Sequence, residues 1–151
     1  MTIERQIQAI IDDAPKYGVP AAVVEQAIAP VLRLYAEKLQ NLDYYVLQNL
    51  NSDWVLTTIT NSQQRKKVIY AFVSVKDAAA FQGKTDPDLL AMPISVVQLL
   101  FRLSSLQQVD SIIFLEDSTN LNYGVEIQRA ILSQQIQQQI LQLGKTPPNL
   151  A

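Results

Sequence analysis

The sequence predicts an α+β fold, an α/β sandwich in which helices cover a small sheet. Apolar residues recur at helical spacing in residues 1–41 and again near the C-terminus, whereas the segments between are short runs rich in β-branched and aromatic residues. We therefore expect N-terminal helices, a mostly antiparallel sheet of three to four strands, and a long C-terminal helix.

The composition predicts a single domain over residues 1–151. We expect a helical segment (1–41), a sheet with its covering helices (42–144) and a tail (145–151). The 151 residues are 48% hydrophobic and 17% charged, which is typical of a globular protein. A chain of this length buries roughly 70% of the surface that its unfolded form exposes, so its core needs no disulfide.

The first predicted helix spans residues 3–14, because isoleucines recur there at helical spacing and Thr2 can cap its start. A second apolar helical face covers residues 20–40. Pro30 interrupts it, because a proline inside a helix removes one backbone hydrogen bond. Either the helix bends at Pro30 or a new helix begins there.

Three strands are predicted next, at residues 44–47, 54–59 and 68–73. The short connections between them have turn composition, which favours an antiparallel meander. The first strand has an alternative, because residues 42–50 could equally extend the preceding helix.

The second half of the chain adds three helices and one strand. The helices are predicted at residues 76–81, 93–101 and 125–143, and the strand at residues 111–115. Because the strand is continuously apolar, we expect it to be central and covered on both faces. Pro93 is a favourable first-turn residue for its helix. Asp86 and Asp88 flank a proline and predict a turn.

The residue types exclude most familiar chemistry. The chain contains no histidine and no cysteine, so the commonest general base, thiolate nucleophiles and sulfur metal sites are excluded. We expect no catalytic residue, no cofactor and no metal. The net charge of −2 disfavours nucleic acid as a partner. No apolar run forms a signal-peptide core or approaches the roughly 18 residues of a membrane span, which predicts a cytoplasmic protein.

Three carboxylates are the candidate ligand groups of an alternative function, a small-ligand-binding protein or an enzyme. Glu116 and Asp117 follow the apolar strand, at an end where α/β sheets often carry functional groups. Asp77 is the third, and Asp110 and Asn120 could join it. Such a site requires these side chains to converge on one pocket.

Residues 10–29 support a third function, a DNA-binding regulator, because a small residue, a glycine and an aliphatic residue stand at helix-turn-helix spacing. Pro15 opposes this interpretation, as does the absence of a basic residue from the second helix before Arg33. The positive run at residues 65–67 favours a solvated hairpin turn over an anion site.

The C-terminal helix is the candidate interaction surface. Glutamines fill most of it, and its apolar stripe consists of Leu132, Ile136, Ile140 and Leu143. An uncharged amide face can pack against a second subunit without burying a formal charge. We therefore expect a protein partner or self-association into a homo-oligomer.

Four segments carry a resemblance to known families, namely residues 54–60, 68–81, 86–90 and 92–95. They resemble the family of the Tic translocon subunit of the chloroplast intermembrane space and its cyanobacterial relatives, and the layout is also similar to the SseB-like domain. The resemblance covers less than half of the chain. It implies a non-enzymatic protein-binding, adaptor or chaperone-like role, in which apolar pockets beside the sheet receive a client.

Overall fold

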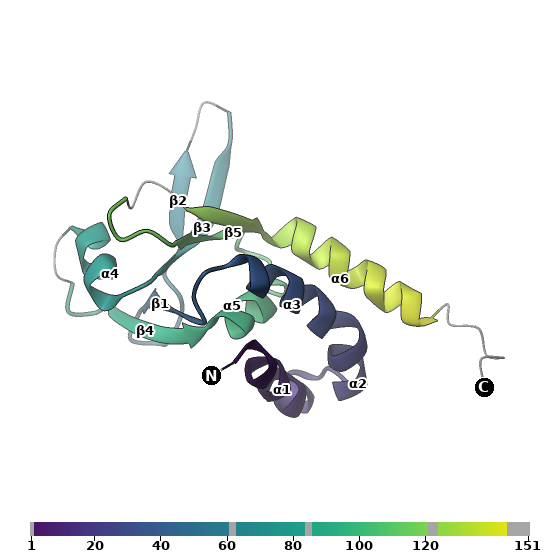
Figure 1. The fold of residues 1–151 in the computed structure, drawn as a ribbon. Coiled ribbons are helices and arrows are strands. Elements are labelled where there is room, and N and C mark those ends of the chain that lie inside the picture. Colours follow the sequence, from purple (N-terminus) through teal and green to yellow (C-terminus); the bar gives the residue numbers. More distant parts are fainter. Residues whose placement is uncertain (1, 61–62, 84–85, 121–123, 145–151) are drawn as a thin grey trace.

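The computed structural model describes residues 2–60, 63–83, 86–120 and 124–144, and it confirms the α+β fold (Figure 1). The predicted tail, residues 145–151, lies outside the described residues. No helix in the described ranges has both the length and the apolar character that crossing a bilayer requires.

The N-terminal helices follow the predicted pattern closely. Helix α1 spans Ile3–Asp13, and the Thr2 side chain caps it by accepting a hydrogen bond from the Arg5 backbone nitrogen (3.2 Å). A 3₁₀ turn, η1 (Ala14–Tyr17), ends at Gly18, whose φ of 72° is the left-handed conformation that favours glycine.

Pro30 lies in the first turn of α3, which agrees with the second of the two predicted alternatives. Three helical stretches run on without a break, namely α2 (Ala21–Val23), the π-helical turn η2 (Val24–Ile28) and α3 (Ala29–Lys38). In the π-helical turn the Ala29 N–H donates to the Val24 carbonyl oxygen, five residues back. The wider turn therefore lies immediately before the proline, which has no N–H to donate.

The sheet has more strands than predicted and is mixed. Its strands are β1 (Asp43–Gln48), β2 (Thr57–Thr60), β3 (Arg65–Phe72), β4 (Leu90–Ser95), β5 (Ser111–Leu115) and β6 (Val125–Gln128). The order is β4-β1-β3-β5-β6, with β2 paired to β3. Only the β3–β5 pair is parallel, so most pairs are antiparallel as expected.

Three predictions in this region were wrong. The strands do not form a meander, because β1 pairs with β3 and β4 and leaves β2 to pair with β3. Pro93 lies inside the edge strand β4, where its missing N–H is tolerated, and α5 (Val96–Leu103) begins later with Ser95 as its cap. Residues 125–128 form strand β6, so α6 spans Arg129–Gly144.

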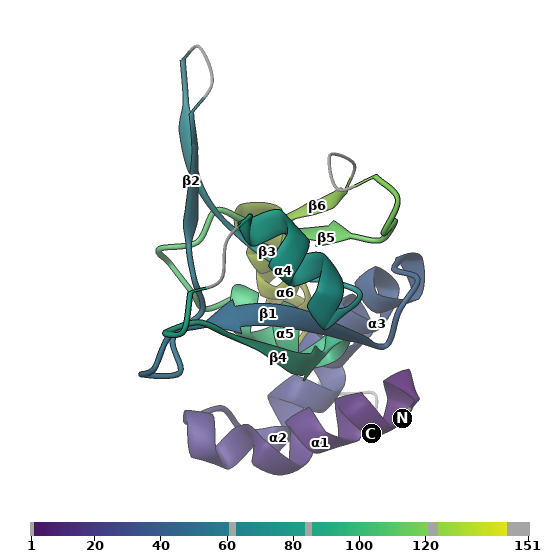
Figure 2. The ribbon, with the colours of Figure 1, turned by 90° about the vertical axis from the view of Figure 1, so that its left-hand side faces the viewer.

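Helices cover the two faces of the sheet unequally. Helices α1, α3, α5 and α6 bury one face, from which Tyr44, Ile69, Ile112 and Phe114 join the main core. Helix α4 (Val75–Gln82) covers part of the other face with a small cluster around Phe72. Figure 2 shows α4 and α1 on opposite sides of β1. The first half of β3 and its partner β2 extend beyond these layers as a hairpin (Figures 1 and 2).

A buried glutamine joins three elements of the main core. Gln6 on α1 is only 2% exposed. Its amide nitrogen donates to the Leu42 carbonyl oxygen (2.9 Å), and its amide oxygen accepts from the Val97 backbone nitrogen at the start of α5 (3.2 Å). Ser95 accepts from the next free N–H, that of Gln98 (3.2 Å). Gln6 therefore fixes α1 against both β1 and α5 and helps to cap α5.

Replacing Gln6 tests this role. We expect Gln6→Leu to lower the free energy of unfolding by about 1–3 kcal/mol, because the buried Val97 N–H loses its acceptor, whereas the Leu42 carbonyl oxygen still accepts from the Val96 backbone nitrogen. Chemical denaturation monitored by circular dichroism measures the change. Gln8→Leu, at an exposed position of the same helix, is the matched control, and an equal loss in both variants would contradict the role of Gln6.

Candidate functional site

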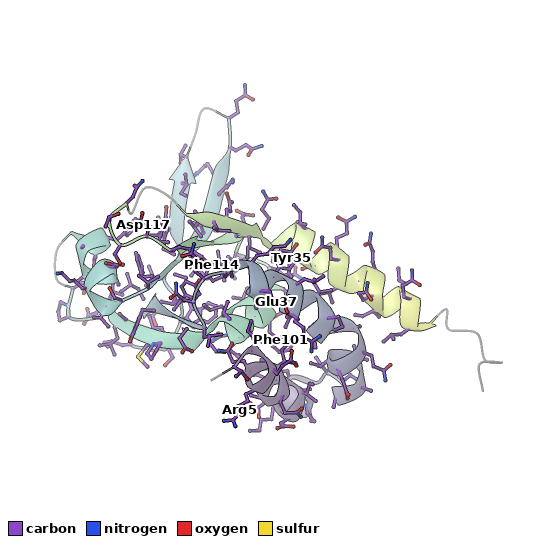
Figure 3. The ribbon with its side chains drawn as sticks, viewed as in Figure 1. Arg5, Tyr35, Glu37, Phe101, Phe114 and Asp117 are labelled. Atoms are coloured by element: carbon purple, nitrogen blue, oxygen red, sulfur yellow. The ribbon has the colours of Figure 1, made fainter. Side chains whose placement is uncertain are left out.

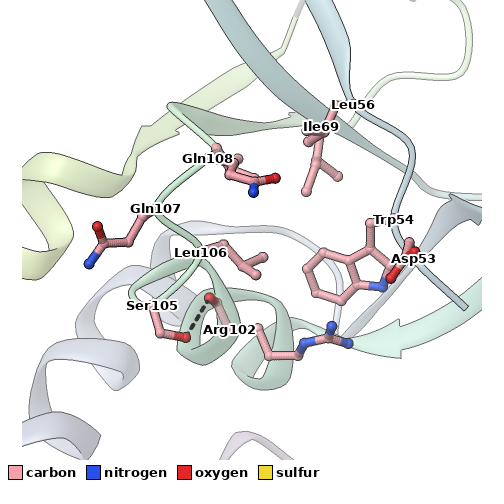
Figure 4. A pocket seen from close by; sticks show the side chains of 10 residues that line it. Asp53, Trp54, Leu56, Ile69, Arg102, Ser105, Leu106, Gln107 and Gln108 are labelled. Atoms are coloured by element: carbon pink, nitrogen blue, oxygen red, sulfur yellow. Dashed lines mark hydrogen bonds between the residues drawn. The ribbon is translucent and has the colours of Figure 1, made fainter.

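The candidate site is a pocket of about 560 Å³ beneath the β2–β3 hairpin, at the edge of the helix layer (Figure 4). The loop after β1, strand β3, the end of α5 and the loop before β5 each contribute to its wall. Its volume lies within the range of small-ligand pockets in proteins.

A tight turn at residues 49–53 places Trp54 in the pocket wall. The Asn49 side-chain oxygen accepts hydrogen bonds from the backbone nitrogens of Asn51 (2.9 Å) and Asp53 (3.1 Å). Ser52 adopts a left-handed φ of 65°, which is uncommon outside glycine. After the turn Trp54 bridges back to Gln48, so the chain returns alongside β1 with the indole directed into the fold.

The Trp54 indole is 8% exposed, yet its Nε1–H donates to no acceptor among the described residues. A buried donor without a partner costs about 1–3 kcal/mol. The indole nitrogen is a donor only, so it can be satisfied only by an acceptor.

Arg102, in the last turn of α5, lies over the Trp54 ring, with its guanidinium carbon 4.0 Å from the ring centroid. Such stacking is a cation–π interaction and holds the guanidinium in place. Ser105 closes the end of this helix by donating to the Arg102 carbonyl oxygen (3.1 Å; Figure 4). Among the described residues, no carboxylate oxygen lies within 4.0 Å of the Arg102 side-chain nitrogens.

The rest of the wall is apolar inside and polar at the rim. Ile69 and Val109 are buried, and the exposed amides of Gln107 and Gln108 lie at the edge together with the carboxylate of Asp53. Figure 4 shows the nitrogen edge of the indole on the same side as the guanidinium. The arrangement therefore offers two kinds of hydrogen-bond donor beside apolar surface.

Glu116, the first predicted ligand carboxylate, is engaged inside the fold. One oxygen accepts from the Gln40 backbone nitrogen (2.6 Å), and the other accepts from the Tyr44 hydroxyl and from the Asn41 side-chain nitrogen (3.2 Å). Burial raises the pKa of Tyr44 well above its ordinary value of 10.0, and the Glu116 carboxylate raises that pKa further. Glu116 thus ties the end of α3 to the end of β5.

The other predicted carboxylates have partners of their own. Asp77 is buried and accepts from the Ser118 hydroxyl (2.6 Å). Asp117 lies in the loop after β5 (Figure 3), where hydrogen bonds from the Thr119 hydroxyl and backbone nitrogen lower its pKa. Asp110 stands at the opposite end of β5 from these groups.

The carboxylate hypothesis required one shared pocket, and Asp110 does not meet that requirement. Within the described ranges, no three acidic side chains gather in a way that could hold a metal ion. The acidic turn behaves as predicted, since the Asp86 side chain accepts from the Asp88 backbone nitrogen (2.9 Å).

The apolar stripe of α6 packs mainly within the chain. Leu132 and Ile136 are buried in the main core, and Ile140 packs against it while partly exposed. Leu143 is also partly exposed. Two residues outside the stripe are more accessible, Ile131 (47% exposed) and Leu141 (60%). The predicted stripe therefore offers a partner only its last turn, because its first half holds α6 to the fold.

In the segment proposed for DNA binding, the small residue Ala14 and the aliphatic Val24 are buried in the core. Arg33 is the first basic residue that follows the turn at Gly18. It donates two hydrogen bonds to the Glu4 carboxylate (2.6 and 3.1 Å). These contacts hold the N-terminal helices together.

Sequence reasoning missed Trp54 and Arg102 as site residues. Two signals could have indicated them. Trp54 is the only tryptophan of the chain and directly follows a turn, and Arg102 is the only charged residue in the apolar helix α5.

The chain matches no protein-family model, and no curated protein is significantly similar to it. The predicted resemblance to the translocon and SseB-like families therefore stays a prediction.

The Tyr44–Glu116 pair predicts a pH dependence. Because the pKa of Tyr44 is raised in the folded state, its contribution to stability is complete below about pH 10 and is lost as the pH rises above that value. We expect Tyr44→Phe to unfold more easily at neutral pH and to lose less stability than the parent on going from about pH 9 to about pH 11. Denaturant titrations at several pH values measure this. Tyr17→Phe, at an exposed position, is the control, and a parallel decline in parent and Tyr44→Phe would contradict the assignment.

Proposed function

We propose that this protein is a non-enzymatic binding protein of the adaptor type, and that the Trp54–Arg102 pocket takes up a partner group combining a carboxylate with an apolar body. The carrying observation is the buried, unpartnered Nε1–H of Trp54 beside the unpaired guanidinium of Arg102.

The donor chemistry of the pocket supports a carboxylate as the recognised group. An indole N–H and a guanidinium can only donate, and a guanidinium stays charged at any ordinary pH. A carboxylate has two acceptor oxygens and can take hydrogen bonds from both donors at once. Because a hydrogen bond to a charged group in a partly buried site is stronger than a neutral one, the anion is favoured over an amide of the same shape.

The buried apolar wall supports an apolar body attached to that carboxylate. Ile69 and Val109 line the interior, and covering them removes apolar surface from water at about 25 cal/mol per Å². Binding rather than catalysis fits the titratable groups of the pocket wall. They are the guanidinium of Arg102 and the exposed carboxylate of Asp53. A guanidinium is suited to binding an anion and not to acting as a general base.

Neither alternative function gains a specific observation in its favour. The predicted ligand carboxylates Asp77, Glu116 and Asp117 each accept hydrogen bonds from neighbouring groups of the chain. Self-association and a cytoplasmic location stay predictions, and light scattering during gel filtration measures the former.

The single tryptophan makes the pocket directly observable. We expect 4-phenylbutanoate to shift the fluorescence of Trp54 saturably, because the carboxylate and the ring both contact the indole. The matched amide, 4-phenylbutanamide, should bind about tenfold more weakly, and Arg102→Gln should remove this difference. Circular dichroism of Arg102→Gln controls for misfolding. Equal affinity for acid and amide in the parent protein would rule out carboxylate recognition.

A further inference from the structure

Basic side chains lead from the pocket along one face of the β2–β3 hairpin. Lys67 and Arg65 alternate with Ile69 along β3, and residues two apart on a strand lie on the same face. Ile69 lines the pocket, so the alternation along the strand places Lys67 and Arg65 on the same face of β3 as the pocket, although they do not line it. We call these two residues, together with Arg102 in the pocket wall, the hairpin strip.

The members of the hairpin strip lack an acidic partner. Among the described residues, no carboxylate oxygen lies within 4.0 Å of the side-chain nitrogens of Arg65, Lys67 or Arg102. Lys66 provides the contrast on the opposite face of the same strand, where it pairs with Glu126 at 2.9 Å. The strip is therefore positive at the surface of a chain whose net charge is −2.

Three acidic residues stand close to the strip and limit its charge. Glu126 lines a second hollow together with Arg65 and Asp110 and pairs with Lys66. Asp110 uses one carboxylate oxygen to accept from the Lys67 backbone nitrogen (2.8 Å), which fixes it against the strand. Asp53 lies at the pocket rim and is exposed. With Gln107 and Gln108 it offers acceptors and donors of the kind that peptide backbone groups need.

We propose that the pocket receives its carboxylate from an acidic peptide segment of a partner protein, and that this segment lies along the hairpin strip. The inference rests on the proposed function of the pocket. From Ile69 to Arg65 the strand covers about 13 Å, which an extended peptide of five residues matches. Acidic side chains of such a segment can pair with Lys67 and Arg65 while one apolar residue enters the pocket.

The carboxylate in the pocket has two possible sources, the C-terminus of the segment or an acidic side chain. Both present the same acceptor oxygens to Trp54 and Arg102. A peptide with a free C-terminus and its amidated twin distinguish them, because amidation abolishes binding only in the first case.

The test uses the fluorescence of Trp54 in the full chain. The probe is the peptide Glu-Glu-Glu-Ser-Val-Phe with an acetylated N-terminus, and its twin carries glutamine in place of each glutamate. We expect the acidic peptide to bind about fivefold more tightly at low salt, since exposed charge pairs contribute modestly, and the advantage should shrink as salt is added. The double variant Arg65→Gln/Lys67→Gln should lose the advantage. Lys66→Gln removes one positive charge from the other face and should keep most of the advantage.

The outcomes separate the inference from the proposed function. Equal binding of the acidic and glutamine peptides, with 4-phenylbutanoate still bound, would overturn the acidic segment and leave the pocket function intact. Failure of all three probes to change the Trp54 emission would overturn both. Displacement of the acidic peptide by single-stranded oligothymidylate at equal concentration would assign the strip to polyanions in general and so overturn a peptide partner. A loss of the advantage in Lys66→Gln as large as in the double variant would remove the strip from the mechanism.

Discussion

The unequal length of β3 and its neighbours is the constraint on which the rest of the structure depends. Strand β3 has eight residues, but its parallel partner β5 has five and pairs only with residues 68–72. On the opposite edge of β3, β1 pairs only at Phe72, and β2 pairs with residues 65–68. Because β5 begins only opposite Val68, the first half of β3 extends with β2 beyond the layers as a hairpin, and the pocket lies beneath it.

The one-sided helix layer gives the pocket a rigid floor. Gln6 fixes the start of α5 to α1 and β1, so the last turn of α5, which carries Arg102, projects from an anchored helix. The ring of Trp54 supports the guanidinium from the other side. A binding group held by both packing and stacking loses little side-chain freedom when a ligand arrives, which favours affinity.

The fold was largely predictable because apolar residues recur at helical spacing in α1 and α3, and because short runs rich in β-branched and aromatic residues mark β3 and β5. Pro93 misled the prediction of β4, since a proline at a helix start and a proline in an edge strand look alike in sequence. Strand β6 has only four residues and runs directly into α6, so the helical pattern masked it. The pocket was not predictable in the same way, because its wall joins residues as distant as Asp53 and Val109, and only the strand order brings them together.

The parallel pairing of β3 with β5 also sets an order of assembly. The segment between these strands contains α4, β4 and α5, so their registry is a contact of long range, and such contacts close slowly. On a ribosome, the N-terminal helices and the β2–β3 hairpin leave the exit tunnel before β5 is made. The pocket therefore cannot form in the nascent chain until the residues around Val109 have emerged, so any molecule that needs the whole pocket meets only a chain that has been made at least that far.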